Sequence, residues 1–400
     1  MKKSLVFAAI AAAAFGTSAQ AATITVLPGQ LESVFAKAQP GDVLVLQGTF
    51  GRDILQNRSF STRVTIDARG ATFPQGIIIR DSSNVTVLGG TFGNSTAALN
   101  SGRAMWLNRT NNVTITGSTF IGAGGSGAGQ GIIVDASRNL AIRSSNFSGF
   151  KSGFSLYGAR NAILDRNNFT QNTSDGINIV NSASVRATNN QCSNFTLLDG
   201  AHPDCIQLWS LAGLPMQTNI WLIGNSAIGN MQGFTSFDPS TASGQFLRFE
   251  NNYVENSFPQ GIACYGCFDS VFLGNTLIAM PGAKHKTSLN VIGGARNVIG
   301  SNTLIDNRLG TASTTTLSAL SASSLSDLGA ELADTGSVWD PRSFGIEDWQ
   351  IAEAEAVARE GGFVFGSNNA VPEPATWAQL LAGFGLIGLV RRRRKTRVAA

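Results

Sequence analysis

The chain has 400 residues, of which 43% are hydrophobic and 14% are charged, and its formal net charge is +4. The excess of positive charge comes from the two ends. Without the eight Lys and Arg of residues 1–21 and 371–400, and without Glu373, 21 basic and 24 acidic residues remain. This near balance excludes the strongly basic surface typical of nucleic-acid binding, and we expect no nucleic-acid partner.

Residues 1–21 predict a secretory signal peptide. Met1-Lys2-Lys3 supplies the positive start, residues 5–15 are apolar, and Ala19-Gln20-Ala21 supplies the small residues of a cleavage site. The mature protein would then begin at Ala22. A signal anchor that stays in the membrane is the alternative, but the apolar run is short for one.

Residues 31–38 predict a short amphipathic helix, followed by a turn at Pro40-Gly41-Asp42. After it, one sequence motif recurs nine times. In each copy a polar residue precedes an apolar run, and a usually apolar residue stands eight positions after that polar residue. The opening residues are Asn84, Asn112, Asn139, Asn161, Ser184, Asn219, Gln245, Ser270 and Asn297. The eighth residues are Phe92, Phe120, Phe147, Phe169, Cys192, Ala227, Tyr253, Ile278 and Ile305. Successive copies are 22 to 35 residues apart, which indicates a solenoid with turns of variable length.

Apolar residues within each copy alternate or form short runs, as at residues 113–116, 131–134 and 175–179, and this period of two indicates strands. The pattern resembles the right-handed parallel β-helix of the pectate-lyase-like superfamily over residues 22–310. The resemblance implies an all-β, single-stranded solenoid of about ten coils, with Phe and Asn residues stacked in internal ladders. The helix at residues 31–38 would cap its first coil, which would otherwise expose core and strand edges.

Four cysteines fit an oxidising, exported compartment. Pairing between near neighbours would join Cys192 to Cys205 and Cys264 to Cys267. The alternative is a zinc site made from all four thiolates, which would require the two pairs to converge across two coils.

The longest coil carries the strongest candidate for chemistry. Extra length in a solenoid emerges as a loop on one face, which is often the binding face. This loop holds Asp199, His202, Asp204 and Gln207. The His-x-Asp-x-x-Gln pattern resembles a phrase found in many bacterial β-helix proteins, and it does not assign one reaction.

Alignment of the coils places Asp204 in one column with Asp175 of the preceding coil, about 4.8 Å away. Two such carboxylates could share a proton, act as an acid and nucleophile pair, or bind Ca²⁺ that neutralises a uronate. The alternative for Asp175 is a strand-start residue that hydrogen-bonds turn amides. The sequence does not identify which residues would bind a metal ion.

An outward column five places further along the same strand is mostly aromatic: Tyr157, Trp209, Phe237 and Tyr265, with Val180 and Ile292 among them. Such a stripe indicates a sugar-stacking platform or a surface covered by the tail segment, unless the register is misjudged. Lys284 and Lys286 flank His285 on a turn and could hold an anionic polymer, or be solvated. Arg248, expected to point outward, is a candidate for binding a carboxylate of the polymer.

Residues 311–370 are expected to form an acidic segment, with a linker rich in Ser, Thr and Ala or a weak helix on the last coil at its start and a short helix at residues 348–360. Residues 371–400 contain Pro372-Glu373-Pro374, Trp377, an apolar run and a cluster of arginines. This order resembles the PEP-CTERM sorting signal of Gram-negative bacteria. The resemblance implies export, transient insertion of the tail in the inner membrane, and processing by an exosortase. The final location would be the periplasm, the cell surface or the extracellular matrix.

Two functions therefore remain in view. The first is an exported enzyme that acts on an anionic polysaccharide by β-elimination, epimerisation or hydrolysis, with His202 or a lysine as base and Asp204, Asp175 or a cation stabilising charge. The dense calcium-ligand acids of pectate lyases and the paired catalytic aspartates of polygalacturonases are not found in the sequence. The second is a non-catalytic surface or matrix protein that binds exopolysaccharide. A purely structural solenoid is a third reading.

Overall fold

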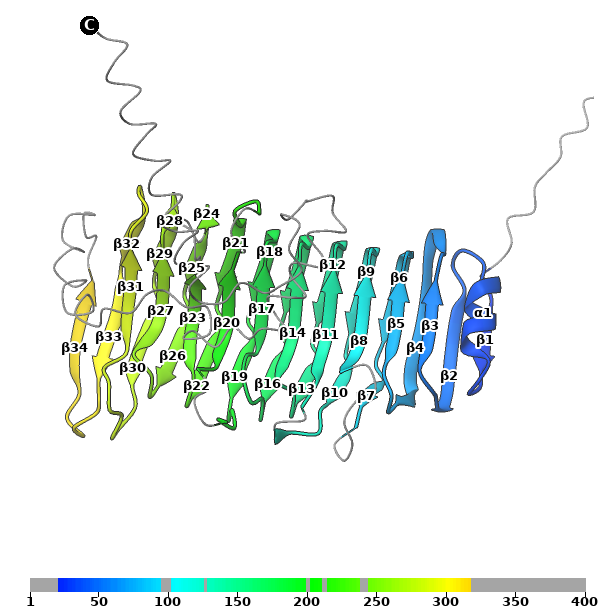
Figure 1. The fold of residues 1–400 in the computed structure, drawn as a ribbon, viewed down its shortest axis with the longest axis horizontal. Helices are drawn as coiled ribbons and strands as arrows, with labels where there is room; N and C mark the ends of the chain where they lie inside the picture. The colour runs from blue at the N-terminus through cyan, green and yellow to red at the C-terminus, as the bar shows by residue number, and fades with distance from the viewer. Residues whose placement is uncertain are drawn as a thin grey trace, which may run out of the picture.

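The computed structural model describes residues 21–94, 102–125, 128–198, 202–210, 214–237 and 244–317. They form a β-solenoid of about nine turns, close to the ten expected, which is elongated along one axis with its coils stacked from the N-terminal end to the C-terminal end (Figure 1).

One side of the coils forms a ten-stranded parallel sheet, here called sheet B. Its strands are β3 (Asp53–Gln56), β5 (Ile77–Arg80), β8 (Arg103–Asn108), β11 (Gln130–Asp135), β14 (Ser152–Tyr157), β17 (Ile177–Val180), β20 (Asp204–Trp209), β23 (Gln232–Phe237), β27 (Gln260–Tyr265) and β31 (Ser288–Ile292).

The other sides form a 24-stranded sheet, here called sheet A, whose two stacks are joined through the 15-residue strand β4. The first stack contains β1 (Thr23–Val26), β2 (Val43–Thr49), β4 (Ser59–Phe73), β6 (Ser83–Leu88), β9 (Asn111–Thr116), β12 (Arg138–Arg143), β15 (Arg160–Asp165), β18 (Ala183–Thr188), β21 (Thr218–Ile223), β24 (Gly244–Gln245), β25 (Arg248–Glu250), β28 (Cys267–Phe268), β29 (Val271–Leu273) and β32 (Val298–Gly300). The second contains β7 (Thr91–Gly93), β10 (Thr119–Ile121), β13 (Asn146–Ser148), β16 (Asn168–Thr170), β19 (Gln191–Ser193), β22 (Ser226–Gly229), β26 (Tyr253–Asn256), β30 (Thr276–Ala279), β33 (Asn302–Asp306) and β34 (Ser313–Leu317).

The expected helix is present as α1 (Leu31–Lys37) and lies over the first coils. Leu31 and Phe35 are its buried residues, and the Phe35 ring meets Phe60 edge-on with centroids 5.5 Å apart. The guanidinium of Arg58 donates to the carbonyls of Ala36 and Ala38, where a helix end has unpaired acceptors. Helix α1 therefore covers apolar surface at the N-terminal end, as predicted.

A stack of phenylalanine rings runs through the core. Successive centroids are 4.6 to 5.1 Å apart along Phe50, Phe73, Phe92, Phe120, Phe147 and Phe169. This spacing equals the rise of one coil, so each ring meets its counterpart in the next coil. Cys192 and then Ala227 take the next positions of the column. The repeated phenylalanine is thus the packing unit of the N-terminal half.

A ladder of buried asparagines runs beside the core in the C-terminal half: Asn167, Asn190, Asn225, Asn252, Asn275 and Asn302. Asn225 is typical, because its Nδ2 donates to Ala187 O and Asn252 Oδ1 while its Oδ1 accepts from the backbone and side chain of Asn190. The ladder therefore satisfies backbone groups at the turns that water cannot reach. It confirms the internal asparagine ladder expected from the sequence.

The opening polar residues have a backbone role. Six of the nine have a positive φ of 55° to 60°, a region that Asn adopts more readily than most residues. In the last three coils the positive φ moves to Phe246, Asp269 and Arg296, next to the expected residues. The core column there consists of Val254, Leu277 and Leu304 rather than the predicted Tyr253, Ile278 and Ile305, so the predicted register is wrong by one residue.

Residues 313–317 differ from the expected linker or weak helix. They form β34, which pairs antiparallel with β33, the last coil strand. The three threonines of this segment favour a strand, and pairing satisfies the edge of the last coil. Among the described residues no helix is long and apolar enough to span a membrane. The signal peptide, the helix at 348–360 and the sorting tail lie outside the described residues.

Candidate functional site

Asp175 and Asp204 lie side by side on the outer face of sheet B. Strand β20 pairs with β17 so that Ile206 is opposite Ile177, which places Asp204 beside Asp175 two residues earlier. Gln232 of β23 is opposite Asp204 on the other side. The column predicted by aligning the coils is therefore confirmed.

Protein donors surround this pair of carboxylates. Asp175 Oδ1 accepts from the Asp204 backbone N–H at 3.0 Å, and Asp175 Oδ2 accepts from Asn178 Nδ2 at 2.9 Å. Asp204 Oδ1 accepts from the Thr235 hydroxyl at 2.7 Å, and Asp204 Oδ2 accepts from Gln207 Nε2 at 3.3 Å. The two side chains are thereby fixed in position by three neighbouring strands.

Both carboxyl groups are buried, with 1% of Asp175 and none of Asp204 exposed. Burial is the main cause that raises the pKa of Asp204 well above its ordinary value, and the charge of Asp175 acts in the same direction. The hydrogen bond from Thr235 opposes this shift. Asp204 is thus suited to hold a proton and to donate it.

A second outward column continues the polar character of this region. It contains Ser155, Asn178, Gln207 and Thr235 on β14, β17, β20 and β23, all of them buried. Ser155 Oγ, Asn178 Oδ1 and Gln232 Oε1 have no hydrogen-bond partner within the described part of the chain. We call Ser155, Asp175, Asn178, Asp204, Gln207, Gln232 and Thr235 the polar cluster. Because buried polar atoms are nearly always paired, the unpaired ones mark a place where another group could bind.

The aromatic column lies along the other edge of the polar cluster, in the predicted register. Tyr157, Val180 and Trp209 are buried together with Ile133 in one apolar cluster against which Leu214 packs. Phe237 is fully buried and stacks on Tyr265 at 5.1 Å. Of the aromatic residues only Tyr265 is partly exposed, so the described part of the stripe fits the covered-surface alternative better than an open stacking platform.

His202 is half-buried, and its ring lies edge-on to Phe258 with centroids 6.3 Å apart. In the described part of the chain no hydrogen bond joins His202 to either carboxylate. Asp199 lies outside the described residues, and its relation to the site stays a prediction.

The structure joins Cys192 to Cys205 and Cys264 to Cys267, with Cα atoms 5.5 and 5.9 Å apart, which is the pairing expected from their spacing. The first disulfide fixes the start of β20 directly behind the carboxylates. A Cβ atom on Gly176 would lie 2.5 Å from Cys205 O and 2.8 Å from Cys192 Sγ. The glycine after Asp175 therefore makes room for the bridge that holds Asp204 in place.

The predicted basic residues are not part of this site. Arg248 lies on β25 of sheet A, where its guanidinium pairs with Glu250 and lies over the Trp221 ring. Arg248 points outward, as expected, but it lies on a different side of the coil from Asp175 and Asp204, so its role in binding a carboxylate of a polymer stays a prediction. Lys284 and Lys286 are exposed on the turn before β31, and Lys286 Nζ is 3.8 Å from Asp306. Within the described ranges no group of three or more His, Cys, Asp or Glu could hold a metal ion.

Sequence reasoning missed Asn178 and Thr235, which hold the carboxylates, and it missed Trp106 and Ile133 on the same face. The repeat contained the information needed to find them, since these residues occupy the position between the aspartate and aromatic columns in every coil. Their neighbours in the N-terminal coils are Ile54 and Ile78, which look like ordinary core residues of a strand.

Comparison with known proteins supports the fold. The sequence matches the family described as right handed beta helix region over residues 54–196 and 126–305, and the PEP-CTERM protein-sorting motif over residues 370–395. No curated protein matches at the level of sequence.

Several solved structures are similar in shape at low identity. They include the surface adhesin PfbA of Streptococcus pneumoniae (TM-score 0.47, 13% identity, 72% of this chain and 83% of that chain). An alginate lyase from Paenibacillus sp. str. FPU-7 (0.46, 19%, 68% and 98%) and DFA-IIIase from Arthrobacter chlorophenolicus A6 (0.43, 10%, 74% and 80%) are others. At these scores no function is transferred from them. The chain belongs to the right-handed β-helix family and carries a C-terminal PEP-CTERM motif, which indicates export and processing by an exosortase.

Proposed function

We propose that this protein acts on an acidic polysaccharide at the cell envelope and that the outer face of sheet B binds the polymer. The observation that carries the proposal is the polar cluster, which is buried on the outward side of the sheet and not in the core. Unpaired buried atoms such as Ser155 Oγ and Gln232 Oε1 lower stability. Sugar hydroxyls can donate and accept, so a bound carbohydrate would satisfy such atoms.

Asp204 is the proposed proton donor and Asp175 its partner. Hydrolysis and β-elimination both break the bond between a sugar carbon and the linking oxygen, and the electron pair stays on that oxygen. A protonated Asp204 would supply the proton that this oxygen needs. In elimination Asp175 would accept a proton from the sugar carbon. In hydrolysis, because the two carboxyl groups lie side by side, Asp175 would attack the sugar carbon as nucleophile, and water that gives its proton to Asp204 would then release the sugar from Asp175. His202, two residues before Asp204, is the other candidate base, with Asp199 as its neighbour.

The remaining predicted contacts take supporting roles in this proposal. Gln207 would exchange its bond to Asp204 for one to a sugar hydroxyl. Tyr265 would stack on the polymer beyond the cluster, because it is the aromatic residue of the column that is partly exposed. Lys284 and Lys286 would hold an acidic sugar at the C-terminal end. Trp209 and Tyr157 would form the apolar wall that keeps the polar cluster in position.

The sorting motif gives the setting. We propose that the tail inserts transiently in the inner membrane and that the processed protein stays at the cell surface or in the extracellular matrix. An acidic exopolysaccharide of the producing cell would be the polymer it meets there.

The second candidate function is binding without turnover. It is favoured by the complete burial of Asp204 and the near-complete burial of Trp209, because a reacting sugar must touch the acid that serves it. In that case the carboxylates would order the strand starts, and the exposed parts of the face would hold the polymer.

Proton NMR time courses on a panel of acidic and neutral polysaccharides separate the two functions. The panel is mixed with the protein, with Asp204→Asn, and with Asp269→Asn as a matched change at a partly exposed carboxylate near sheet A. Turnover predicts new unsaturated or reducing-end signals with the protein and with Asp269→Asn, and none with Asp204→Asn. Unchanged spectra with line broadening for an acidic polymer would reject catalysis and support binding.

A further inference from the structure

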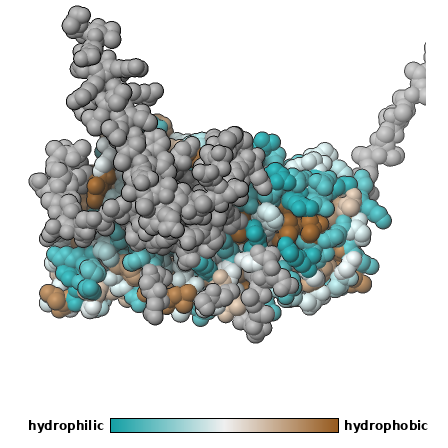
Figure 2. All heavy atoms as spheres, viewed as in Figure 1, coloured by the Kyte–Doolittle hydropathy of each residue, from teal (hydrophilic) through white to brown (hydrophobic). Residues whose placement is uncertain are grey.

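The N-terminal half of the outer face of sheet B carries a second group of side chains, separate from the polar cluster. Here the middle column is apolar and consists of Ile54, Ile78, Trp106 and Ile133. The next column is polar: Gln56, Arg80, Asn108 and Asp135. Beyond β11 the middle column becomes polar, with Ser155 and Asn178, and the next column becomes apolar or aromatic, with Tyr157 and Val180. Figure 2 shows a small apolar patch bordered by hydrophilic residues over the N-terminal coils.

Trp106 is held in a fixed orientation within the middle column. Its indole N–H donates to Asp135, and the guanidinium of Arg103 lies over its ring at 4.5 Å from the centroid. The side chain is half-buried and packs against Ile133, so part of the indole faces solvent. A fixed, partly exposed indole next to a guanidinium suits a sugar that carries a negative charge.

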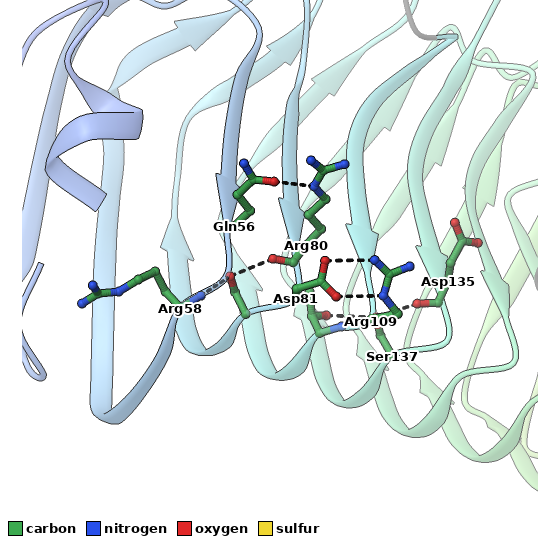
Figure 3. Close-up of polar contacts among 9 residues, drawn as sticks. Gln56, Arg58, Arg80, Asp81, Arg109, Asp135 and Ser137 are labelled. Carbon is green, nitrogen blue, oxygen red and sulfur yellow. Dashed lines mark hydrogen bonds and ion pairs between the residues drawn. The ribbon is translucent and has the colours of Figure 1, made fainter. Parts of the chain in front are cut away.

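Arg80 provides a second guanidinium on the neighbouring strand. Its Nε donates to Gln56 Oε1 at 2.7 Å, and its two terminal nitrogens make no hydrogen bond within the described part of the protein (Figure 3). Arg109 contrasts with it, because both its Nε and one terminal nitrogen donate to Asp81, at 2.8 and 2.9 Å. Arg80 therefore retains its two terminal nitrogens, whose parallel N–H donors can bind a carboxylate end-on.

Gln130 adds an independent sign of a missing partner. It is opposite Arg103 in the register of β8 and β11, it is 6% exposed, and its Oε1 has no hydrogen-bond partner among the described residues. A buried amide oxygen of this kind accepts readily from a hydroxyl. A sugar hydroxyl that lies next to Trp106 would supply such a donor.

We propose that Arg80, Arg103, Trp106 and Gln130 form a binding subsite for an acidic segment of the polysaccharide. Arg80 binds a carboxylate, the indole contacts a sugar ring, and Gln130 accepts from a hydroxyl. The subsite lies three coils, about 14 Å, from Asp175 along the same face, so one polymer chain can occupy both. This inference deepens the proposed function by assigning the residues that select an acidic polymer.

The test is isothermal titration calorimetry with oligogalacturonate, oligoguluronate and hyaluronan tetrasaccharides, and with maltotetraose as the neutral probe. The variants are Arg80→Gln, Trp106→Leu and, as the matched control, Arg109→Gln, whose guanidinium is already paired. Circular dichroism and thermal melting of each variant establish that it is folded. We expect an acidic probe to bind and maltotetraose not to bind. Arg80→Gln should weaken binding roughly tenfold or more, the value of a charge-assisted hydrogen bond.

Trp106→Leu should also weaken binding, whereas Arg109→Gln should leave it unchanged. Folded Arg80→Gln protein with wild-type affinity would overturn the subsite. Equal losses in Arg80→Gln and Arg109→Gln, or no binding of any acidic probe at millimolar concentration, would overturn it as well. Turnover assays beside the calorimetry separate the two proposals. Binding that depends on Arg80, without turnover by the wild-type protein, keeps the subsite and rejects the enzyme. Turnover that Arg80→Gln leaves unchanged keeps the enzyme and rejects the subsite.

Discussion

Replacement of Asp204 by asparagine is expected to stabilise the fold at neutral pH while it removes the proposed proton donor. Burial and the charge of Asp175 raise the pKa of Asp204 well above its ordinary value of 3.8. The same group titrates near 3.9 in an unfolded chain. Between these two pKa values the folded protein therefore holds a proton that the unfolded chain has lost.

The sign and size of the effect follow from this difference. Because the folded state binds more protons, the free energy of unfolding falls as pH rises through the window above about 4, by about 1.4 kcal/mol per pH unit for one group. The asparagine side chain of the variant would not titrate, and the Gln207 amide can rotate to accept from it. The stability of Asp204→Asn relative to wild type should thus rise with pH above about 4, by up to about 1.4 kcal/mol per pH unit, until the pH passes the raised pKa of Asp204.

Urea unfolding followed by circular dichroism over a series of pH values measures this difference directly. Asp53, whose pKa is also raised, to about 6, is present in both proteins and cancels in the comparison. Asp269→Asn is the control. A hydrogen bond from Arg296 lowers the pKa of Asp269, so its contribution to stability changes only below about pH 4, and the relative stability of this variant should not vary with pH above that value. A variant at Asp204 that is less stable than wild type above neutral pH would refute the reasoning, since Asp204 would then be an ionised structural residue.

Three further outcomes are expected. Replacing Cys192 and Cys205 by serine opens a bridge with a sequence separation of 13 and should cost about 3 kcal/mol; an unchanged melting temperature would contradict this. Asn225→Ala removes a ladder side chain that takes part in four hydrogen bonds, and urea unfolding should show a loss of about 3 kcal/mol or more, whereas a loss below about 1 kcal/mol would mean that the ladder is dispensable. The hydrogen bond from Arg308 lowers the pKa of Asp306 to about 2, so Arg308→Gln should shift the carboxyl titration seen by NMR back toward 3.8; no shift would reject that assignment.

Much of the fold is predictable from the sequence because a solenoid repeats its contacts. Phe120 and Phe147 recur in sequence because their rings stack in adjacent coils, and Asn225 recurs because each coil has a turn to satisfy. The same regularity allows outward residues to be aligned, and it correctly placed Asp175 beside Asp204. Local spacing was sufficient for both disulfides.

The rest depends on contacts that a repeat does not encode. Burial of an outward residue such as Trp209 requires other segments to lie over the sheet, and the coil pattern says nothing of them. Which side of the coil carries Arg248 could not be predicted, because loops of different length separate the three sides of a coil. Trp106 went unnoticed because the residues of its column in the adjacent coils are isoleucines, which resemble core residues.

The crystal structure of Asp204→Asn with a bound acidic oligosaccharide tests the central claim most directly. The account predicts a sugar chain on the outer face of sheet B, with an acidic group at Arg80, a ring at Trp106 and a linking oxygen near residue 204. A sugar chain bound instead on sheet A, for example at Trp221 between Arg186 and Arg248, would contradict it.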